Sequence, residues 1–187
     1  MLKKISYMTA GESHGKGLIG IIEGIPAGMN ITEEYIEKDL LRRMQGHGRG
    51  GRMKIEKDHA EIFSGVRHAI TLGSPISLLI KNFDWVNWED RMATGKPKKE
   101  HRKVTMPRPG HADLAGVMKY GLDDIRNVLE RSSARETAMR VAIGAVCRKL
   151  LEEVGITVGS RVYQIHNIVD ETPVSNNMSL KELNDTV

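Results

Sequence analysis

Three histidines lie in glycine-flanked turns, where a side chain can meet a small ligand. They are His14 in Ser-His-Gly, His47 in Gly-His-Gly and His111 in Gly-His-Ala. Glycine lets the backbone approach a ligand closely, and imidazole gains and loses protons near neutral pH. The pattern indicates general acid–base chemistry, although each histidine alone also fits a surface or structural position. No spacing typical of metal ligands occurs, so the histidines are not interpreted as a metal site.

Two arginine-containing segments have the chemistry of anion sites. Arg49 and Arg52 flank two glycines, and arginine binds phosphate or carboxylate through two parallel hydrogen bonds. A solvated basic loop and a nucleic-acid-binding segment are the alternatives for this stretch. Residues 131–135 place two arginines and two serines at the expected start of a helix, where free N–H groups favour phosphate. Capping explains Ser133 but gives the two arginines no role.

The composition limits the class of protein. The 187 residues, 40% hydrophobic and 28% charged, can form one domain with its own core. A single cysteine, Cys147, excludes an internal disulfide framework and a cysteine-rich zinc site. The net charge of +4 includes cationic patches at residues 42–54 and 96–103, which indicate anionic partners. Only 4% of the residues are aromatic, which argues against a module that stacks on nucleic-acid bases.

No segment predicts a membrane span or a signal peptide. The longest stretch without a charged residue or histidine, residues 69–80, is far shorter than the ~20 residues that a spanning helix needs. Polar residues follow Lys3 and Lys4 too soon for a signal peptide. The chain is therefore expected to be cytoplasmic, with no membrane partner.

The elements that must position these residues are short strands mixed with helices. Strands are predicted at residues 2–9, 18–22, 53–57, 61–66, 76–81 and 157–165. Helices are predicted at 33–44 with Thr32 as N-cap and Gly46 as stop, at 112–120, at 123–129, and from Ser133 to Gly155. In the last helix, Ser133 and Glu136 fit a capping box, and apolar residues recur at helical spacing. The stretch 85–103 is predicted to be a long polar loop.

Five motifs occur in order along the chain. They are Thr-Ala-Gly-Glu-Ser-His-Gly at 9–15, Glu-Gly-Ile-Pro-Ala-Gly at 23–28, Gly-Arg-Gly-Gly-Arg-Met at 48–53, Pro-Arg-Pro-Gly-His-Ala-Asp at 107–113 and Glu-Arg-Ser-Ser-Ala-Arg-Glu-Thr at 130–137. Together they closely resemble the amino-terminal half of the chorismate synthase family, over about residues 5–165. A chance match to five long motifs in order is not credible.

The resemblance implies a fold and a reaction. The family has an α+β fold, a layered β-α-β sandwich, and is typically a homotetramer. It converts 5-enolpyruvylshikimate 3-phosphate to chorismate and phosphate by a 1,4-anti elimination, in the shikimate pathway of aromatic amino acid biosynthesis. The reaction has no net redox change but requires reduced FMN, and some members reduce their flavin with NADPH.

The resemblance also implies roles for matching residues. His14 matches the histidine that protonates the departing phosphate, and His111 matches the one that protonates or orients the reduced flavin. The arginines that match those holding the substrate are Arg43 (or its neighbour Arg42), Arg49, Arg108 and Arg135. The segment that matches the flavin contacts is Arg131, Ser132 and Ser133. These roles agree with the anion and acid–base chemistry expected from the residue types.

Family members are about twice as long as this chain. The other half carries further flavin contacts and an Arg-Ser-Asp motif that does not occur here. Residues 1–187 are therefore expected to be the amino-terminal half of a single chorismate synthase-like domain. The alternatives are a catalytically incomplete fragment and a basic nucleic-acid-binding module.

Overall fold

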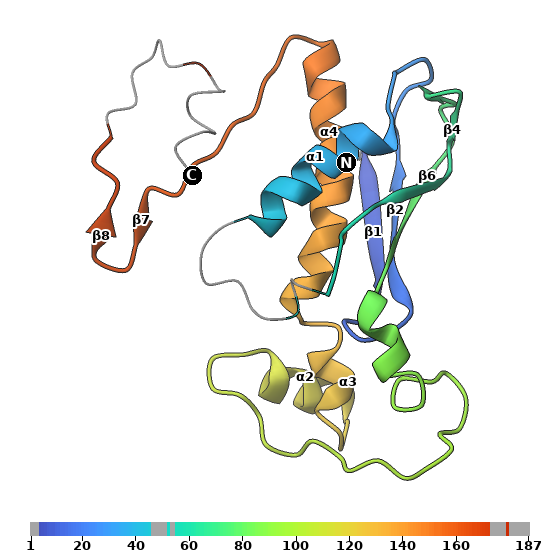
Figure 1. Ribbon diagram of the computed structural model, residues 1–187, viewed down its shortest axis with the longest axis vertical. Coiled ribbons are helices and arrows are strands. Elements are labelled where there is room, and N and C mark those ends of the chain that lie inside the picture. Colours follow the sequence, from blue (N-terminus) through green and yellow to red (C-terminus); the bar gives the residue numbers. More distant parts are fainter. Residues whose placement is uncertain (1–3, 46–51, 53–54, 173–178, 180–187) are drawn as a thin grey trace. The chain divides into compact units, whose positions relative to one another are not determined.

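The computed structural model describes residues 4–45, 52, 55–172 and 179 (Figure 1). The chain divides into two compact units, Met1–Val146 and Cys147–Val187. All the described residues with a predicted site role belong to the first unit. Within the described ranges, we find no helix with both the length and the apolar character needed to span a membrane.

The first unit is built on a four-stranded antiparallel sheet in the order β1-β2-β6-β3. The strands are β1 (Ser6–Gly11), β2 (Gly17–Glu23), β6 (Ile76–Lys81) and β3 (Glu61–Ser64). Side chains alternate across a strand, so Leu18 and Ile22 of β2 are buried while Ile19 and Ile21 are exposed. The strands predicted at residues 18–22 and 76–81 are confirmed, and β1 starts and ends later than predicted.

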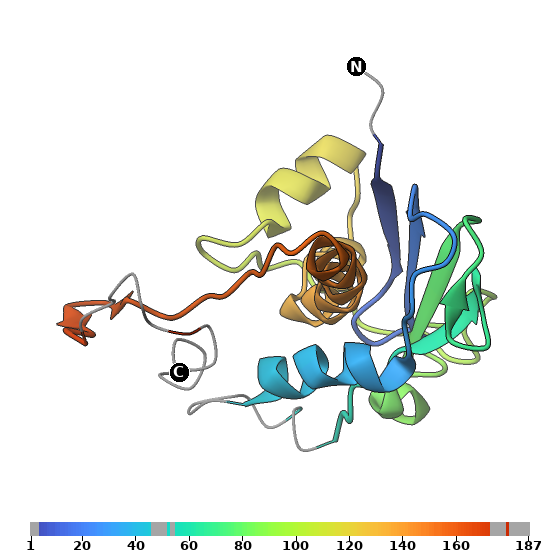
Figure 2. The same cartoon turned by 90° about the horizontal axis from the view of Figure 1, so that it is seen from above.

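Two helices cover one face of this sheet, as Figure 2 shows. They are α4 (Thr137–Glu153), of which residues 137–146 belong to the first unit, and α1 (Glu33–Met44). Gly20 of β2 allows the close approach of α4, since a Cβ there would lie 2.5 Å from Sδ of Met139. A sheet layered against helices confirms the predicted α+β class.

Helix α1 agrees with its sequence signals. The backbone at Thr32 is extended, and its side-chain oxygen accepts a hydrogen bond from the N–H of Tyr35 at 3.2 Å. Ile36 and Leu40 are buried and turn the helix's apolar side into the core. The predicted cap and span are confirmed, whereas Gly46, the predicted stop, lies outside the described residues.

Shorter elements connect these layers. They are β4 (Val66–Arg67), β5 (Ile70–Thr71), η2 (Phe83–Asn87), α2 (Asp113–Tyr120), α3 (Arg126–Leu129), η3 (Ala134–Glu136), β7 (Gln164–Ile165) and β8 (Ile168–Val169). Helix α2 confirms the prediction at 112–120. The loop predicted at 85–103 starts later than predicted, because residues 85–87 belong to η2. In the second unit, β7 and β8 form a hairpin near an ion pair of 3.5 Å between Arg161 and Asp170.

Four further predicted elements differ in the structure. The strand predicted at 53–57 is wrong for its described residues, 55–57, which form a turn and irregular chain. The strand predicted at 61–66 is interrupted at Gly65, where a φ of +83° turns the chain. The helix predicted at 123–129 is shortened to α3. The strand predicted at 157–165 is reduced to β7, because its earlier residues find no strand partner among the described residues.

The start of α4 also differs from the predicted capping box. Ser133 acts as a cap, accepting from the N–H of Arg135 at 3.3 Å, but the 3₁₀ turn η3 follows before α4 begins. The Glu136 carboxylate does not bond back to Ser133. It accepts from Oγ1 of Thr9 at 2.6 Å and from Nε of Arg140 at 2.7 Å. The predicted hydrogen bond from Ser133 N–H to the Glu136 carboxylate is therefore wrong, because this carboxylate binds Thr9 on β1.

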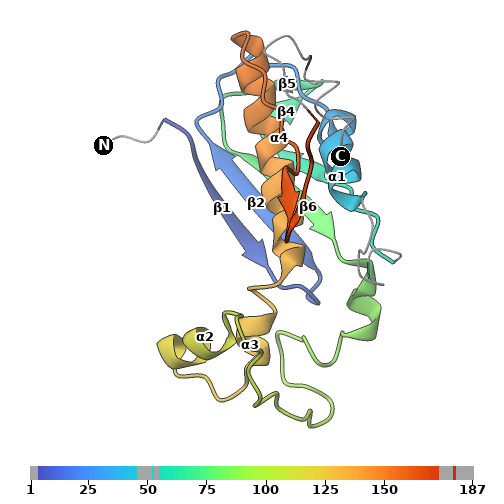
Figure 3. The ribbon, with the colours of Figure 1, turned by 90° about the vertical axis from the view of Figure 1, so that its left-hand side faces the viewer.

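One end of the sheet collects the segments with predicted functions (Figure 3). There the β1–β2 turn, the chain leaving β6 and the connection from α3 to α4 lie side by side. Hydrogen bonds join them: Asn82 after β6 bonds to Gly15 of the turn, and Glu130 after α3 bonds to His14.

Candidate active site

The turn between β1 and β2, which carries one of the predicted histidines, has a tightly fixed backbone. Gly11 has a φ of +104°, and a Cβ there would lie 2.3 Å from the carbonyl oxygen of Gly17, so only glycine fits. Asn82 donates from Nδ2 to the carbonyl oxygens of Glu12 at 3.0 Å and Gly15 at 2.8 Å. Asn82, which directly follows the neighbouring strand β6, therefore fixes the shape of the turn.

Glu130, directly after α3, holds the His14 side chain. Its two carboxylate oxygens lie 3.0 and 2.9 Å from Nδ1 of His14, and Oε2 also accepts the backbone N–H of His14 at 2.8 Å. The backbone oxygen of Glu130 accepts the N–H of Ser13 at 2.9 Å. The Glu130 side chain is only 2% exposed, whereas that of His14 is 24% exposed. The imidazole is thus anchored on its inner side and open on its outer side.

The charge of Glu130 is stabilised by its surroundings. Burial opposes ionisation, but hydrogen bonds from the ring and backbone N–H of His14, together with the positive charges of His14 and Arg126, outweigh it. The net effect lowers the pKa of Glu130 below its ordinary value. Arg126 contributes from Nη1, 3.1 Å from Oε1. Glu130 is therefore an ionised acceptor at neutral pH.

Trp88 covers a face of the His14 ring. The two ring centroids are 4.0 Å apart and their planes are inclined by 33°. The indole N–H donates to Asp84 at 3.0 Å, and the guanidinium carbons of Arg91 and Arg126 lie 5.4 and 5.1 Å from the indole centroid. These contacts fix the indole and, through it, the plane of the imidazole.

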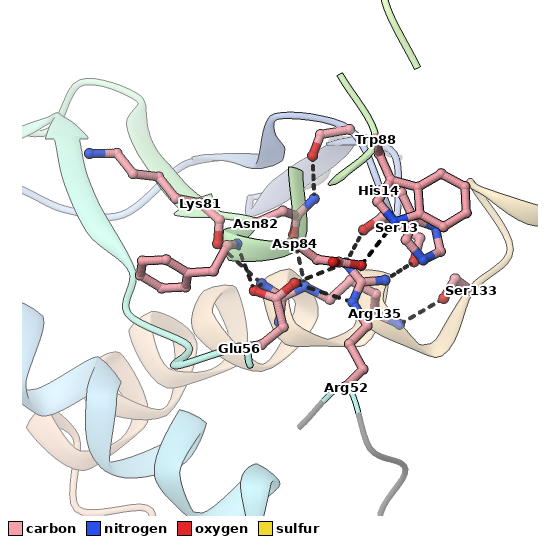
Figure 4. A network of polar contacts seen from close by, with 12 residues as sticks. Ser13, His14, Arg52, Glu56, Lys81, Asn82, Asp84, Trp88, Ser133 and Arg135 are labelled. Carbon is pink, nitrogen blue, oxygen red and sulfur yellow. Dashed lines mark hydrogen bonds and ion pairs between the residues drawn. The ribbon is translucent and has the colours of Figure 1, made fainter. Parts of the chain in front are cut away.

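A buried network lies beneath this turn (Figure 4). Arg52 donates from Nη1 to Oγ of Ser13 at 2.6 Å and from Nη2 to the Ser13 carbonyl oxygen. Glu56, which is buried, accepts from Nη2 of Arg52 at 2.9 Å and from the N–H of Phe83 at 2.9 Å. The network ties the turn to the segment after β6.

Arg135, predicted to hold substrate, belongs to this network. Its side chain is 5% exposed; Nη1 donates to Asp58, Nε donates to Asn82 at 2.9 Å, and Nη2 lies 3.5 Å from Glu56. Arg43, also predicted to hold substrate, donates to the other oxygen of Asp58 at 3.1 Å. Asp58 is therefore shared by two of the predicted arginines, and both guanidiniums are engaged by protein groups.

His111, the other histidine with a predicted catalytic role, lies in a different part of the first unit. Nδ1 of His111 is 2.8 Å from Oδ1 of Asp113 and 3.0 Å from Nη2 of Arg108. Arg108 binds both Asp113 oxygens, at 3.0 and 3.1 Å, and its side chain is 52% exposed while Asp113 is fully buried. The hydrogen bond from Arg108 is the largest cause that keeps the pKa of Asp113 far below its ordinary value, against the opposing effect of burial.

An open hollow of about 570 Å³ lies beside His111. The residues that line it are His111, Arg131, Ser132, Ser133, Ala134, Glu136, Thr137 and Arg140. The three residues predicted to contact flavin thus share one cavity with the histidine predicted to act on flavin. Arg131 donates to the carbonyl oxygen of Thr9 at 2.8 Å, and Oγ of Ser132 donates to the Val128 carbonyl.

The hollow fits a phosphate-bearing cofactor such as FMN in size and donor chemistry. Its volume lies in the range of ordinary ligand sites, roughly 300–1,000 Å³. Two half-exposed guanidiniums, Arg131 and Arg140, line it together with serine hydroxyls. Among the described lining residues, Glu136 alone carries a carboxylate, which accepts from Thr9 and Arg140 and lies 3.6 Å from Nη2 of Arg131. The residues present can therefore hold an anionic group at this position.

Several site residues had no role in the sequence interpretation. Glu130 and Asp113 stand inside the quoted motifs, and only their position beside a histidine or arginine could have marked them. Asn82 and Trp88 lie outside every motif, and no local signal points to them. Two predicted candidates, Arg49 and His47, lie outside the described residues. Among the described residues, no cluster of three or more His, Cys, Asp or Glu could hold a metal ion.

Comparisons with known proteins agree with the motifs. Residues 5–186 match the family described as chorismate synthase. The chorismate synthase of Aquifex aeolicus is 60% identical over 165 residues, which are 88% of this chain and 42% of that protein. That of Alkaliphilus metalliredigens is 57% identical over 179 residues, covering 96% of this chain and 47% of that protein. A crystal structure of a chorismate synthase matches with a TM-score of 0.69 at 46% identity, covering 91% of this chain and 41% of that one. The chain spans less than half the length of these relatives.

Proposed function

Because this chain belongs to the chorismate synthase family, we propose that it serves the reaction of that family. The reaction is the 1,4-anti elimination of phosphate from 5-enolpyruvylshikimate 3-phosphate, which yields chorismate. The observation that carries the proposal is the pairing of two carboxylate-held histidines with an arginine-lined hollow in one unit of the chain. An anionic substrate with a phosphate leaving group needs both an acid and fixed positive charge.

His14 is the acid for the departing phosphate. Its outer side is accessible while its inner nitrogen, Nδ1, is held by Glu130. A proton delivered to the phosphate oxygen as the C–O bond breaks neutralises charge at the moment it develops. Arg49 and Arg108 are the proposed direct contacts to substrate anions, and half of the Arg108 side chain is exposed. Arg43 and Arg135 already bind Asp58, so each would have to bind Asp58 and the ligand at the same time.

The hollow beside His111 is the proposed position of reduced FMN. When bound, the flavin supplies the electron-transfer chemistry that the side chains lack. Arg131, Ser132 and Ser133 would hold its anionic and polar groups, and His111 would present a ring nitrogen to it. Asp113 fixes Nδ1 of His111, so the other ring nitrogen faces the ligand. NADPH as the reductant of the flavin is expected from the resemblance to the family.

We also propose that residues 1–187 are the amino-terminal half of a single domain, because the chain covers 42% and 47% of two relatives. The complete protein would be a cytoplasmic homotetramer, as expected from the resemblance. A nucleic-acid-binding module is not favoured, because the family match spans nearly the whole chain.

Anaerobic phosphate release tests the proposal. The purified chain is mixed with 5-enolpyruvylshikimate 3-phosphate and chemically reduced FMN. A chimera in which this chain replaces the matching segment of the Aquifex aeolicus relative is assayed beside it, with the unmodified relative as the positive control. We expect turnover by the chimera and its loss in His14→Asn. A folded chimera without turnover would contradict the proposal. Turnover by the chain alone would mean that residues 1–187 contain enough of the site without the other half.

A further inference from the structure

Glu130 makes more contacts with the His14 turn than a simple ion pair requires. Its carboxylate meets Nδ1 of His14 through both oxygens and also accepts the backbone N–H of the same residue. Its own carbonyl oxygen accepts the N–H of Ser13. One residue therefore fixes the ring and the backbone of His14 at once.

We propose that Glu130 is a positioning residue that holds His14 with a proton on Nδ1 and leaves Nε2 as the only nitrogen that exchanges a proton with a ligand. This inference rests on the proposed function, because it specifies which atom of His14 acts. The sequence comparison gave Glu130 no role.

The hydrogen-bond chemistry fixes the tautomer. An ionised carboxylate only accepts hydrogen bonds, so a ring nitrogen 2.9 Å from it must carry the hydrogen. Burial holds this carboxylate in place, and the positive charge of Arg126, 3.1 Å from Oε1, favours its ionised form. In the neutral ring the hydrogen is then on Nδ1, and Nε2 carries the lone pair.

The surroundings leave Nε2 available. No hydrogen bond from Nε2 to another residue is found in the described part of the chain, while the ring is partly exposed. Trp88 covers one face of the ring. A hydrogen bond to Nε2 forms near the ring plane, because the Nε2 lone pair lies in that plane. In the proposed reaction, the Nε2–H bond of the imidazolium breaks, its proton goes to the phosphate oxygen that takes the C–O electron pair, and Nδ1 keeps its hydrogen.

The tautomer can be measured without substrate, by nuclear magnetic resonance of isotope-labelled imidazole nitrogens in the whole chain, at a pH where the rings are neutral. We expect His14 to carry its hydrogen on Nδ1. His101 is a matched control in the same spectrum, because Asp90 binds it through Nε2 at 2.8 Å, which demands the opposite tautomer. A hydrogen on Nε2 of His14 would overturn the proposal, and this measurement needs no variant.

Glu130→Gln tests the cause. The amide can donate as well as accept, so the variant is expected to lose the fixed Nδ1–H form of His14 while His101 stays unchanged. Asp90→Asn, the matched control, is expected to alter His101 alone. An unchanged His14 tautomer in Glu130→Gln would overturn the proposal.

Turnover separates positioning from a merely structural role. In the chimera with the Aquifex aeolicus segment, Glu130→Gln is expected to lower phosphate release about tenfold to hundredfold, with substrate affinity changed less than about threefold. Equal turnover in both forms would overturn the proposal that Glu130 positions His14 for the reaction. If the unmodified chimera is inactive, the proposed function fails, and the tautomer measurement still decides the role of Glu130 in holding His14.

Discussion

The turns that carry His14 and His111 hold the imidazole ring in the same way, but the carboxylates that hold them come from different distances along the sequence. Each binds Nδ1 to a buried carboxylate, His14 to Glu130 and His111 to Asp113. Glu130 is 116 positions from His14 in the sequence, whereas Asp113 is 2 positions from His111. The first turn therefore depends on the packed fold, and the second is largely organised by its own residues.

The difference extends to the groups behind each carboxylate. The His14 turn is also held by Arg52 and Asn82, from two further segments of the chain. In the described residues, the His111 turn is held by Arg108, whose side chain is half exposed. Substitutions should therefore cost more around His14, because buried groups there lose partners that water cannot replace.

The largest effect is expected for Asp58→Ala. It removes the carboxylate shared by Arg43 and Arg135 and leaves a buried guanidinium short of a partner. Removing one member of a buried ion pair costs about 3–5 kcal/mol in the free energy of unfolding, to be measured by urea denaturation. Asp123→Ala is the control, because its pair with Lys103 is exposed, and no measurable change is expected. Equal effects of the two substitutions would refute the distinction between the buried network and the surface.

A glycine pair compares the two turns directly. Gly11→Ala forces a Cβ to within 2.3 Å of the Gly17 carbonyl oxygen at a φ of +104°, whereas Gly110 has a φ of +71° and open space around its Cβ position. Gly110→Ala is expected to cost about 1 kcal/mol of unfolding free energy from backbone strain alone. Gly11→Ala is expected to cost clearly more, and thermal unfolding of both variants would show it. The opposite order would mean that the β1–β2 turn relaxes freely.

Asp113→Asn tests how much the Asp113 carboxylate, which binds Arg108 and His111, stabilises the protein at different pH values. At pH 7 the loss of the charged hydrogen bonds should destabilise the protein by about 1–3 kcal/mol. The folded state holds the pKa of Asp113 below its ordinary value of 3.8, so this stabilisation is present above pH 3.8 and is lost as the pH falls further. Urea denaturation at pH 7 and pH 3 should show the gap between variant and wild type narrowing in acid. A gap that widens in acid would contradict the assignment.

The smallest effect on stability is expected for Trp88→Phe, which keeps a ring over His14 but loses the hydrogen bond to Asp84. A change below about 1 kcal/mol is expected. The native indole also reports on its neighbour, because a protonated imidazole in contact quenches tryptophan emission. The emission of Trp88 should fall as His14 is protonated. This fall should remain in Trp85→Phe, which removes the other tryptophan of the sequence, and disappear in His14→Asn. A response unaffected by His14→Asn would contradict the contact.

Local signals predicted the local structure well. Thr32 and the apolar spacing behind it predicted α1, and the apolar run at 76–81 predicted β6, because caps and side-chain periodicity act over a few residues. The same reasoning failed for 157–165, since strand propensity alone supplies no partner for the main chain. It also failed for Glu136, whose carboxylate turned to Thr9 on β1.

The sequence by itself determined the family, the α+β class and most of the residue types that chemistry needs. The tertiary structure alone decided which of them meet. It placed Glu130 and Trp88 on His14 and turned Arg135 toward Asp58. Hydrogen bonds and ring contacts act over a few ångströms in space, and spacing along the chain does not report such distances once the chain has folded back on itself.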